Sequence, residues 1–406
     1  MALKTYPLAA LALLTAINFI NYIDRSVLFA VQPLVQGEFK FSDTQYGFLT
    51  TSFFIFYMVA APFIGMAADH YSRKWIVLTG IFLWSGATLL TAVAHNYTGL
   101  LVRHTLVAIG ECSYATIAPA LLADLFPEER RGRMLAIFYL AIPTGTAMGY
   151  ILGGYLGHHF GWRTPFYVAA LPGFLLALFF LLLPEPARGS SDHLMATPDR
   201  ATLRGLAHNG AFWTATLGMA MMTFALGGIS VFLPKFLSQY RGMSLEHANL
   251  LLGTSIGVNG IAATLFGGWL GDRLLRKRDS AYYLVSAVGM ALGIPAMVVA
   301  LYVAGPPMLP AIIVAEFLLL MNTGPLNAAV VNSVSGTIRS SAIGVNLIVI
   351  HLLGDAFSPP LMGYISDRSS LSTAFLVTIV ATALSALVLF YGMRYAPRLH
   401  AMGGEA

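Results

Sequence analysis

Long apolar stretches separated by short polar breaks run along the whole chain. Each stretch is close to the roughly 20 apolar residues that a helix needs to cross a bilayer, and the breaks carry charged residues, Pro or Gly. The twelve stretches lie near 8–34, 44–68, 75–94, 98–125, 133–159, 162–183, 210–238, 245–270, 281–304, 308–335, 341–366 and 372–394. This pattern predicts an all-α integral membrane protein with twelve transmembrane helices.

The composition agrees with this prediction. The 406 residues are 57% hydrophobic and 10% charged, whereas a typical soluble domain has about 25% charged residues. Twelve spans use roughly 240 residues and leave no room for an extramembrane domain. The first stretch follows a lone Lys4 and has no small-residue cleavage site, so we interpret it as a span and not as a signal peptide. The single cysteine, Cys112, excludes a disulfide framework and a thiolate metal cluster.

Basic residues are distributed unevenly between the two sides of the predicted membrane. Sixteen of the 23 Lys and Arg residues fall on one side, five on the other and two inside spans. Because basic residues are retained on the cytoplasmic side, both termini are predicted to be cytoplasmic. The net charge of +5 then reflects membrane topology, and we expect no nucleic-acid partner. The short loops and short termini favour a bacterial inner-membrane protein.

One polar motif occurs twice, after the second and after the eighth span. The spacing Gly-x3-Asp-x3-Arg-Lys is formed by Gly65, Asp69, Arg73 and Lys74, and again by Gly268, Asp272, Arg276 and Lys277. The copies flank the longest polar stretch of the chain. The prediction is two parallel six-helix halves, 1–183 and 210–406, joined by a cytoplasmic linker at 184–209, which is the repeat architecture of major facilitator transporters.

The repeated motif has a physical interpretation as a latch between helices. An Asp at a helix end is stabilised by the dipole of a neighbouring helix N-terminus and by an Arg partner, while Gly permits close backbone approach. A role in gating is therefore predicted for Gly65, Asp69, Arg73, Lys74, Asp272, Arg276 and Lys277. The alternative is that the basic residues are only topology signals.

Charged residues also occur inside two predicted spans, where each costs about 2.5–3.5 kcal/mol on insertion scales. Polar residues form one helical stripe in the first span, made of Asn18, Asn21, Tyr22 and Arg25, with Asp24 at its edge. A second polar face, in the fourth span, consists of Arg103, His104, Glu111 and Tyr114. We expect the two faces to meet around a central cavity.

Two acids in these faces, Asp24 and Glu111, are candidates for proton coupling. The protonation of a poorly hydrated carboxyl group depends strongly on a nearby Arg, so such groups load and release protons as access or substrate changes. Intramembrane ionisable residues are usually functional. The alternative is a permanent structural ion pair that locks the first and fourth spans together.

The second half contributes a further set of cavity candidates. They are Glu316, Asn322 and Asn327 in the tenth span, and His351 and Asp355 in the eleventh. Polar packing between helices explains them equally well. Two ligands at positions i and i+4 are too few for a metal site, so we predict no metal and no cofactor besides the coupling protons. The adjacent His158 and His159 lie at a span end and are interpreted as an interfacial pair.

Several strings in the chain resemble the Spinster family of the major facilitator superfamily. The strings are Asn21 to Arg25, Gly65 to Lys74, Gly110 to Pro119, Arg131 to Met134 with Phe138 to Pro143, Asn322 to Asn327, and His351 to Asp355 with Ser358 to Pro360. The loop motif marks only the superfamily, and Asn-Tyr-x-Asp-Arg is shared with anion:cation symporters. The strings in the fourth, tenth and eleventh spans are more specific.

The resemblance implies transport of lysophospholipids or sphingosine-phosphate-like single-chain lipids, with proton linkage in some members. Residue by residue, Asp24 and Arg25 match the first-span pair, Glu111 the fourth-span acid, and Asp69 and Arg73 the loop latch. An anionic or zwitterionic headgroup suits Arg25, with Asn21, Tyr114 and either Arg103 or His104 as further contacts. The last choice stays open because the family often has an Arg seven residues before the acid, where this chain has His104.

The same charges also suit a proton-coupled symporter of a small organic anion such as a sugar acid, with a smaller and more polar cavity. The sequence has no Gly-x-Ser-x-Gly elbow, no His-Glu-x-x-His pair and no Walker-type loop, so an enzyme is not predicted. The prediction is a secondary active transporter that works by alternating access as a monomer. Its expected partners are a lysolipid or other amphipathic substrate and the surrounding membrane lipids.

Overall fold

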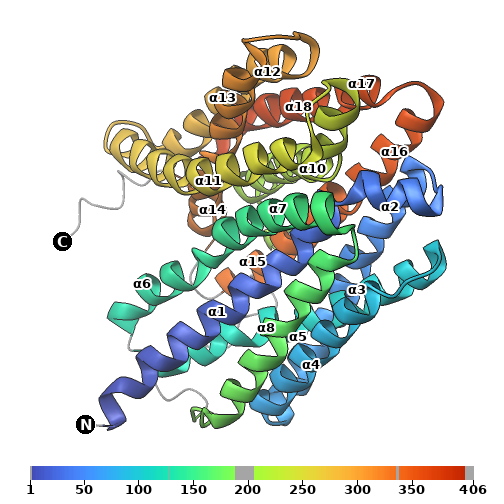
Figure 1. Cartoon of the computed structure of the whole chain (residues 1–406). Helices are drawn as coiled ribbons and strands as arrows, with labels where there is room; N and C mark the ends of the chain where they lie inside the picture. Colours follow the sequence, from blue (N-terminus) through green and yellow to red (C-terminus); the bar gives the residue numbers. More distant parts are fainter. Residues whose placement is uncertain (1, 127, 188–204, 335–337, 398–406) are drawn as a thin grey trace. The chain divides into compact units, whose positions relative to one another are not determined.

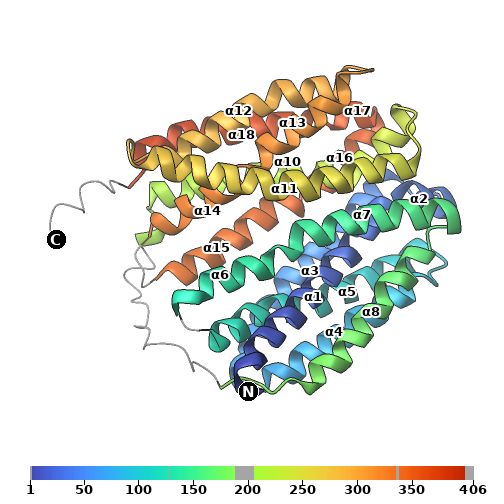
Figure 2. The ribbon, with the colours of Figure 1, turned by 60° about the vertical axis from the view of Figure 1, so that its left-hand side comes forward.

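The computed structural model of the chain describes residues 2–126, 128–187, 205–334 and 338–397 (Figures 1 and 2). Twelve helical segments in this part of the chain are long and apolar enough to cross a membrane, as the sequence predicts. The helices up to the 188–204 stretch are α1 (Ala2–Ala30), α2 (Gln32–Phe39), α3 (Asp43–His70), α4 (Arg73–Thr91), α5 (Tyr97–Leu125), α6 (Glu128–Tyr139), α7 (Ala141–Phe160) and α8 (Thr164–Leu182).

The helices after that stretch are more often interrupted. They are α10 (Gly210–Tyr240), α11 (Leu245–Leu275), α12 (Ala281–Tyr302), α13 (Met308–Leu320), α14 (Thr323–Asn332), α15 (Arg339–Ile350), the π-helical η2 (His351–Asp355), α16 (Ser358–Arg368), α17 (Leu371–Ala374), α18 (Leu376–Gly392) and the short η3 (Met393–Tyr395). The tenth span is broken between α13 and α14, so that Pro325 falls in the first turn of α14, where a missing N–H is tolerated.

By their internal contacts the residues group into two compact units, 1–194 with 233–257, and 195–232 with 258–406. The first unit therefore contains the end of α10 and the first part of α11 in addition to the first six spans. The division into halves at 184–209 stays a prediction, and residues 188–204 of that linker lie outside the described residues.

Small residues bring two helices of the first unit close together. α1 lies along α7 (Figures 1 and 2). A Cβ atom added to Gly149 would lie 2.6 Å from Cβ of Ser26, and one added to Gly153 would lie 2.6 Å from Cβ of Ala30. This close approach holds the C-terminal end of α1 against a neighbouring helix.

α5 lies at the centre of the first unit, in contact with both α3 and α4. Its apolar side chains Val107, Ile117 and Leu121 are buried in the core of that unit. The second unit has its own core, built around α12 with α13 and α18.

Candidate functional site

An ion pair joins α1 to α5 inside the first unit. Nη2 of Arg25 donates to Oε2 of Glu111 at 2.7 Å, and Nε approaches the same oxygen at 3.3 Å. The Glu111 side chain is fully buried and that of Arg25 is 17% exposed. The two polar faces of the first and fourth spans therefore meet, and their contact is a charge-assisted hydrogen bond.

Three aromatic rings surround the guanidinium group of Arg25. Its Cζ atom lies 4.6 Å from the ring centre of Phe53, 5.0 Å from that of Tyr22 and 5.6 Å from that of Tyr57. These distances are within the range of cation–π attraction. The rings come from α1 and α3, and the paired acid Glu111 comes from α5. Three helices therefore position this cation. The sequence shows aromatic residues in the second span but gives no sign of which ones face Arg25.

Asp24 is hydrogen-bonded to α4, and not to α5 as Arg25 is. Thr88 Oγ1 of α4 donates to Oδ2 of Asp24 at 3.2 Å, and Asp24 is only 5% exposed. Thr88 lies 64 positions away and no pattern in the sequence links the two. The neighbouring residues Asp24 and Arg25 therefore bond to different helices, Asp24 to Thr88 of α4 and Arg25 to Glu111 of α5.

Two buried carboxyl oxygens near this ion pair are poorly satisfied. Within the described part of the chain, Oδ1 of Asp24 and Oε1 of Glu111 accept no well-formed hydrogen bond, and the Asn21 side chain lies beside Glu111. Leaving a buried polar atom unpaired costs about 1–3 kcal/mol, more when the group is charged. Such unsatisfied atoms are suited to bind a proton, water or a polar substrate group.

The structure places His104 and Arg103 in different surroundings. The His104 ring is buried and lies 5.2 Å, centre to centre, from Phe53, which also faces Arg25. The Arg103 side chain instead points back along α5, because its Nη1 lies 3.1 Å from where a Cβ of Gly99 would be. His104 is therefore next to the aromatic group around Arg25, whereas Arg103 is directed toward the start of α5.

Tyr114 is a core residue whose hydroxyl is already hydrogen-bonded, and its role at the headgroup stays a prediction. Its hydroxyl donates to the carbonyl oxygen of Leu14, and its ring packs against Trp84 and Phe138 at 5.8 and 6.2 Å. Asn18 also makes a hydrogen bond to the backbone: its Nδ2 donates to the carbonyl oxygen of Phe138 at 3.2 Å. Both side chains thus make their hydrogen bonds to backbone carbonyl oxygens.

Arg73 of the repeated motif pairs with two acids that the sequence analysis did not identify. Its Nη1 donates to Oδ2 of Asp124 at 2.6 Å, and its Nε lies 3.5 Å from Oε1 of Glu185. Lys74 Nζ donates to the carbonyl oxygen of Leu181 at 2.7 Å. Gly65 and Asp69 lie near the end of α3, where Asp69 is exposed.

Glu185 also caps the N-terminus of α4. Its carboxylate accepts hydrogen bonds from Ser72 Oγ at 2.5 Å and from the backbone N–H of Arg73 at 2.9 Å. Burial raises the pKa of Glu185, but these hydrogen bonds and the charge of Arg73 outweigh burial and lower the pKa below its ordinary value. The segment after the sixth span is thus fixed to the start of the third.

The second copy of the motif has a different partner. Tyr282 donates its hydroxyl to Oδ1 of Asp272 at 2.7 Å. Arg276 and Lys277 are exposed just after the end of α11. The spacing is therefore repeated, but the hydrogen bonds around the two copies differ.

The predicted polar residues of the second unit form separate local contacts. Asn259 Nδ2 donates to Oε2 of Glu316 at 3.3 Å, and His351 Nδ1 lies 2.8 Å from Oδ2 of Asp355 within the π-helical turn η2. Asn322 and Asn327 each donate from Nδ2 to a backbone carbonyl four residues earlier. Among these candidates, π-helical geometry singles out the His351–Asp355 pair, because π turns are frequent at functional sites.

Comparison with known proteins gives consistent matches over most of the chain. A family model described as Major Facilitator Superfamily matches residues 14–354. Protein spinster of Drosophila melanogaster is 32% identical over 367 residues, covering 86% of this chain and 60% of the fly protein. The chain thus spans less than two thirds of that relative. The sphingosine-1-phosphate transporter SPNS2 of Xenopus tropicalis is 32% identical over 420 residues, covering 99% of this chain and 81% of that protein.

A solved structure has the same fold. It is a bacterial homolog of the human lysosomal transporter Spinster in an inward-facing and unoccupied conformation. Its TM-score to this chain is 0.89 at 24% identity, over 97% of this chain and 98% of the other. The twelve-helix arrangement predicted from the sequence is therefore that of a solved transporter.

Proposed function

Because the chain belongs to the spinster family of the Major Facilitator Superfamily, we propose that it carries lysophospholipids or related single-chain lipids in exchange for, or together with, protons. It is a multi-pass integral membrane protein of a transporter family. A relative that covers nearly the whole chain is named for transport of sphingosine-1-phosphate, a single-chain lipid with an anionic headgroup. The Arg25–Glu111 pair is the single observation that carries the proposal.

The charges around this pair favour proton coupling. Asp24 and Glu111 together bring two negative charges, against the one positive charge of Arg25. An uncompensated charge in a buried site is strongly unfavourable, so binding of one proton makes the group neutral. A free oxygen of either carboxyl group can take up that proton, while the Thr88 hydroxyl donates to the other oxygen of Asp24.

The same pair suits an anionic headgroup. A phosphate oxygen binds a guanidinium group as a carboxylate does, so a lipid phosphate would compete with Glu111 for Arg25. Once displaced from Arg25, Glu111 is a buried carboxylate without a cation, and it gains from taking up a proton. Substrate binding and proton binding are thereby linked through one side chain. His104 and Asn21 lie near enough in the fold to add polar contacts.

The remaining predictions complete this proposal. Both termini are cytoplasmic in a bacterial inner membrane, and the monomer works by alternating access. Arg73, with Asp124 and Glu185, holds the cytoplasmic ends of α4, α5 and the segment after α8 together. Asp69, Asp272 and the basic residues of the two motifs act as the gating latch.

Transport by purified protein in liposomes tests this proposal. We expect uptake of a fluorescent lysophospholipid above that of empty liposomes, a loss of most of it in Arg25→Ala, and full activity in Glu38→Gln. Glu38 is a suitable control because it is an exposed carboxylate outside the spans. If the lysolipid is not carried while a labelled sugar acid is, the lipid substrate is wrong and the chain is a symporter of small anions.

A further inference from the structure

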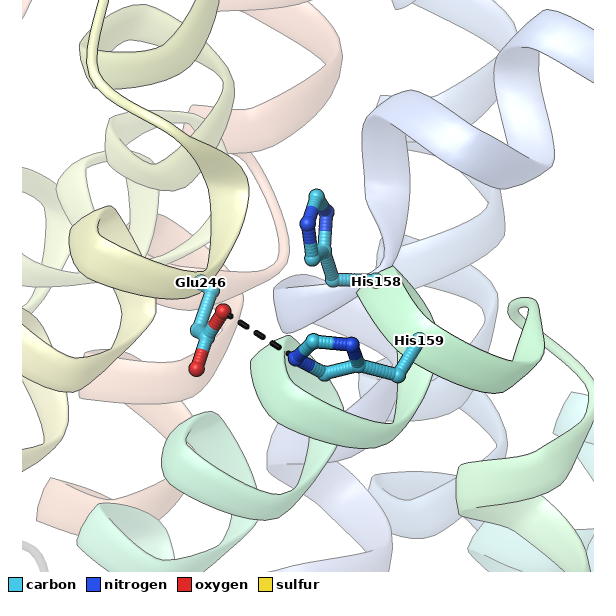
Figure 3. Close-up of side chains that lie close together, drawn as sticks. All are labelled: His158, His159 and Glu246. Carbon is cyan, nitrogen blue, oxygen red and sulfur yellow. Dashed lines mark ion pairs between the residues drawn. The ribbon is translucent and has the colours of Figure 1, made fainter.

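A carboxylate meets the histidine pair at the end of α7. Figure 3 shows the carboxylate of Glu246, from the first turn of α11, directed at the ring of His159, with His158 next to it on α7. Nε2 of His159 lies 3.3 Å from Oε2 of Glu246. One ligand atom of each of the three residues lies within 4.8 Å of the other two. The sequence suggests only an interfacial histidine pair here, because Glu246 is far away along the chain.

Close packing of α7 against the first part of α11 creates this meeting. A Cβ atom on Gly154 would lie 2.4 Å from Cβ of Asn249, and one on Gly253 would lie 2.6 Å from the carbonyl oxygen of Ala147. Partner numbers fall along α11 as they rise along α7, so the two segments run antiparallel. One further turn along each helix brings Glu246 beside the histidine pair. The position of the three side chains thus follows from a tightly packed helix crossing.

The backbone around the site is fixed at both ends. α7 ends at Phe160, and Gly161 follows with a φ of 85°, a conformation that favours glycine. On the other side, Nδ2 of Asn249 donates to the carbonyl oxygens of Leu245 and Ala30 at 2.9 and 3.0 Å. The histidine side chains are exposed, so they can turn without moving the helices.

The donor set matches a known metal chemistry. Two imidazoles and one carboxylate bind zinc in several hydrolytic enzymes, and a fourth position is left for water. Ligand atoms that each lie about 2.1 Å from a tetrahedral zinc ion are about 3.4 Å apart. The His159–Glu246 separation already has this value, and His158 needs a small side-chain rotation to join them.

We propose that His158, His159 and Glu246 bind one divalent transition-metal ion of the zinc class. The ion would link the last turn of α7 to the first turn of α11. These helices belong to the fifth and eighth spans, one on each side of the 184–209 stretch. If the chain transports by alternating access, as proposed above, such a link restrains the ends of these spans and slows transport.

Metal binding is measured on the purified full chain after removal of any histidine tag. Isothermal titration with ZnCl2 should give one site per chain. His159→Ala and Glu246→Gln should each weaken it by at least about tenfold, the loss that even an outer-shell partner of a metal ligand causes. His247→Ala is the matched control, because His247 is exposed next to Glu246 and bonded to Ser244. Equal binding by all four proteins contradicts the site.

Two further readouts separate a real site from loss of folding and from failure of the transport proposal. Cobalt should give the intense absorption of four-coordinate Co2+ in the native chain, and this should disappear in the His158→Ala/His159→Ala variant while its unfolding temperature is unchanged. A weak, octahedral Co2+ spectrum in the native chain contradicts the site even if no lipid is ever transported. ZnCl2 should slow transport by the native chain and not by the double variant; equal slowing of both contradicts the proposed link.

Discussion

Arg25 and Glu111 lie 86 positions apart in the sequence, yet Nη2 of Arg25 donates to Oε2 of Glu111 at 2.7 Å inside the first unit. The Glu111 side chain has no exposed surface, and the guanidinium group is covered by the rings of Tyr22, Phe53 and Tyr57. Removing one partner of such a buried charge pair is costly. A competing anion, in contrast, can replace Glu111 as the partner of Arg25.

Breaking the pair on one side should destabilise the protein more than removing both charges. Glu111→Gln removes the carboxylate that is bonded to Arg25, a loss of about 3–5 kcal/mol, whereas Arg25→Met/Glu111→Leu should be nearly neutral. Thermal unfolding in detergent measures both variants. If the stability lost in the double variant equals the sum of the losses caused by removing each charge alone, the two charges do not depend on each other.

His104 should affect substrate binding and Arg103 should not. The His104 ring packs on Phe53 next to Arg25, while the Arg103 side chain turns back toward Gly99. Loss of one polar contact of about 1.4 kcal/mol corresponds to a tenfold weaker apparent affinity for the lysolipid in His104→Ala. Concentration dependence of uptake gives this value, with Arg103→Ala as the control. A tenfold effect in Arg103→Ala alone would reverse the assignment.

Glu185 should stabilise the start of α4 through its hydrogen bonds to Ser72 and to the Arg73 amide. Ser72 itself makes no side-chain cap in this helix, so the later carboxylate takes that place. Glu185→Ala should cost about 1 kcal/mol, as the loss of a helix cap does. Hydrogen exchange should become faster at the amides of Arg73 and Lys74 and stay unchanged at the start of α5. Unchanged exchange at Arg73 would rule out the cap.

Glu38 gives a prediction for acidic pH. Hydrogen bonds from Arg163 and Trp162 lower the pKa of Glu38 to about 2, below the ordinary value of about 4.3. The pKa is depressed in the folded state, so the stabilisation is present above about pH 4.3 and is lost as the pH falls toward 2. The effect should stay below about 1 kcal/mol, since the carboxylate is largely exposed.

Unfolding temperatures at a series of pH values check this expectation. The unfolding temperature of the native chain should be higher than that of Glu38→Gln at neutral pH. This difference in unfolding temperature should shrink as the solution is acidified. Arg163→Gln should show the same small pH dependence as Glu38→Gln, because it removes the same hydrogen bonds. A difference that grows in acid would contradict the lowered pKa.

The spans and the two charged faces could be predicted from the sequence because both depend on local patterns. Twelve apolar stretches give twelve helices, and residues three or four apart share a face. Spacing along a helix alone puts Arg103 on the same face as Glu111 and does not tell in which direction its long side chain extends. Side chains on a helix point toward its N-terminus, and Arg103 accordingly reaches back toward Gly99.

Partners distant in the sequence could not be predicted. Arg73 meets Asp124 and Glu185, which lie 51 and 112 positions away, and no repeat or spacing connects them. Tyr114 lies on the predicted face, but its hydroxyl binds the backbone of Leu14, a contact that depends on how α1 packs against α5. The meeting of Glu246 with the two histidines likewise requires the packing of α7 on α11.

We propose that the buried residues Asp24, Arg25 and Glu111 couple the transport of a lysolipid to the movement of a proton. The direct measurement is proton movement into proteoliposomes that contain a trapped pH-sensitive dye, started by adding lysophospholipid without any imposed gradient. We expect a lipid-dependent pH change with the native chain and with Glu38→Gln, and none with Asp24→Asn or Glu111→Gln. Lipid transport with no pH change in the native chain, or an equal pH change in Asp24→Asn and Glu111→Gln, would contradict it.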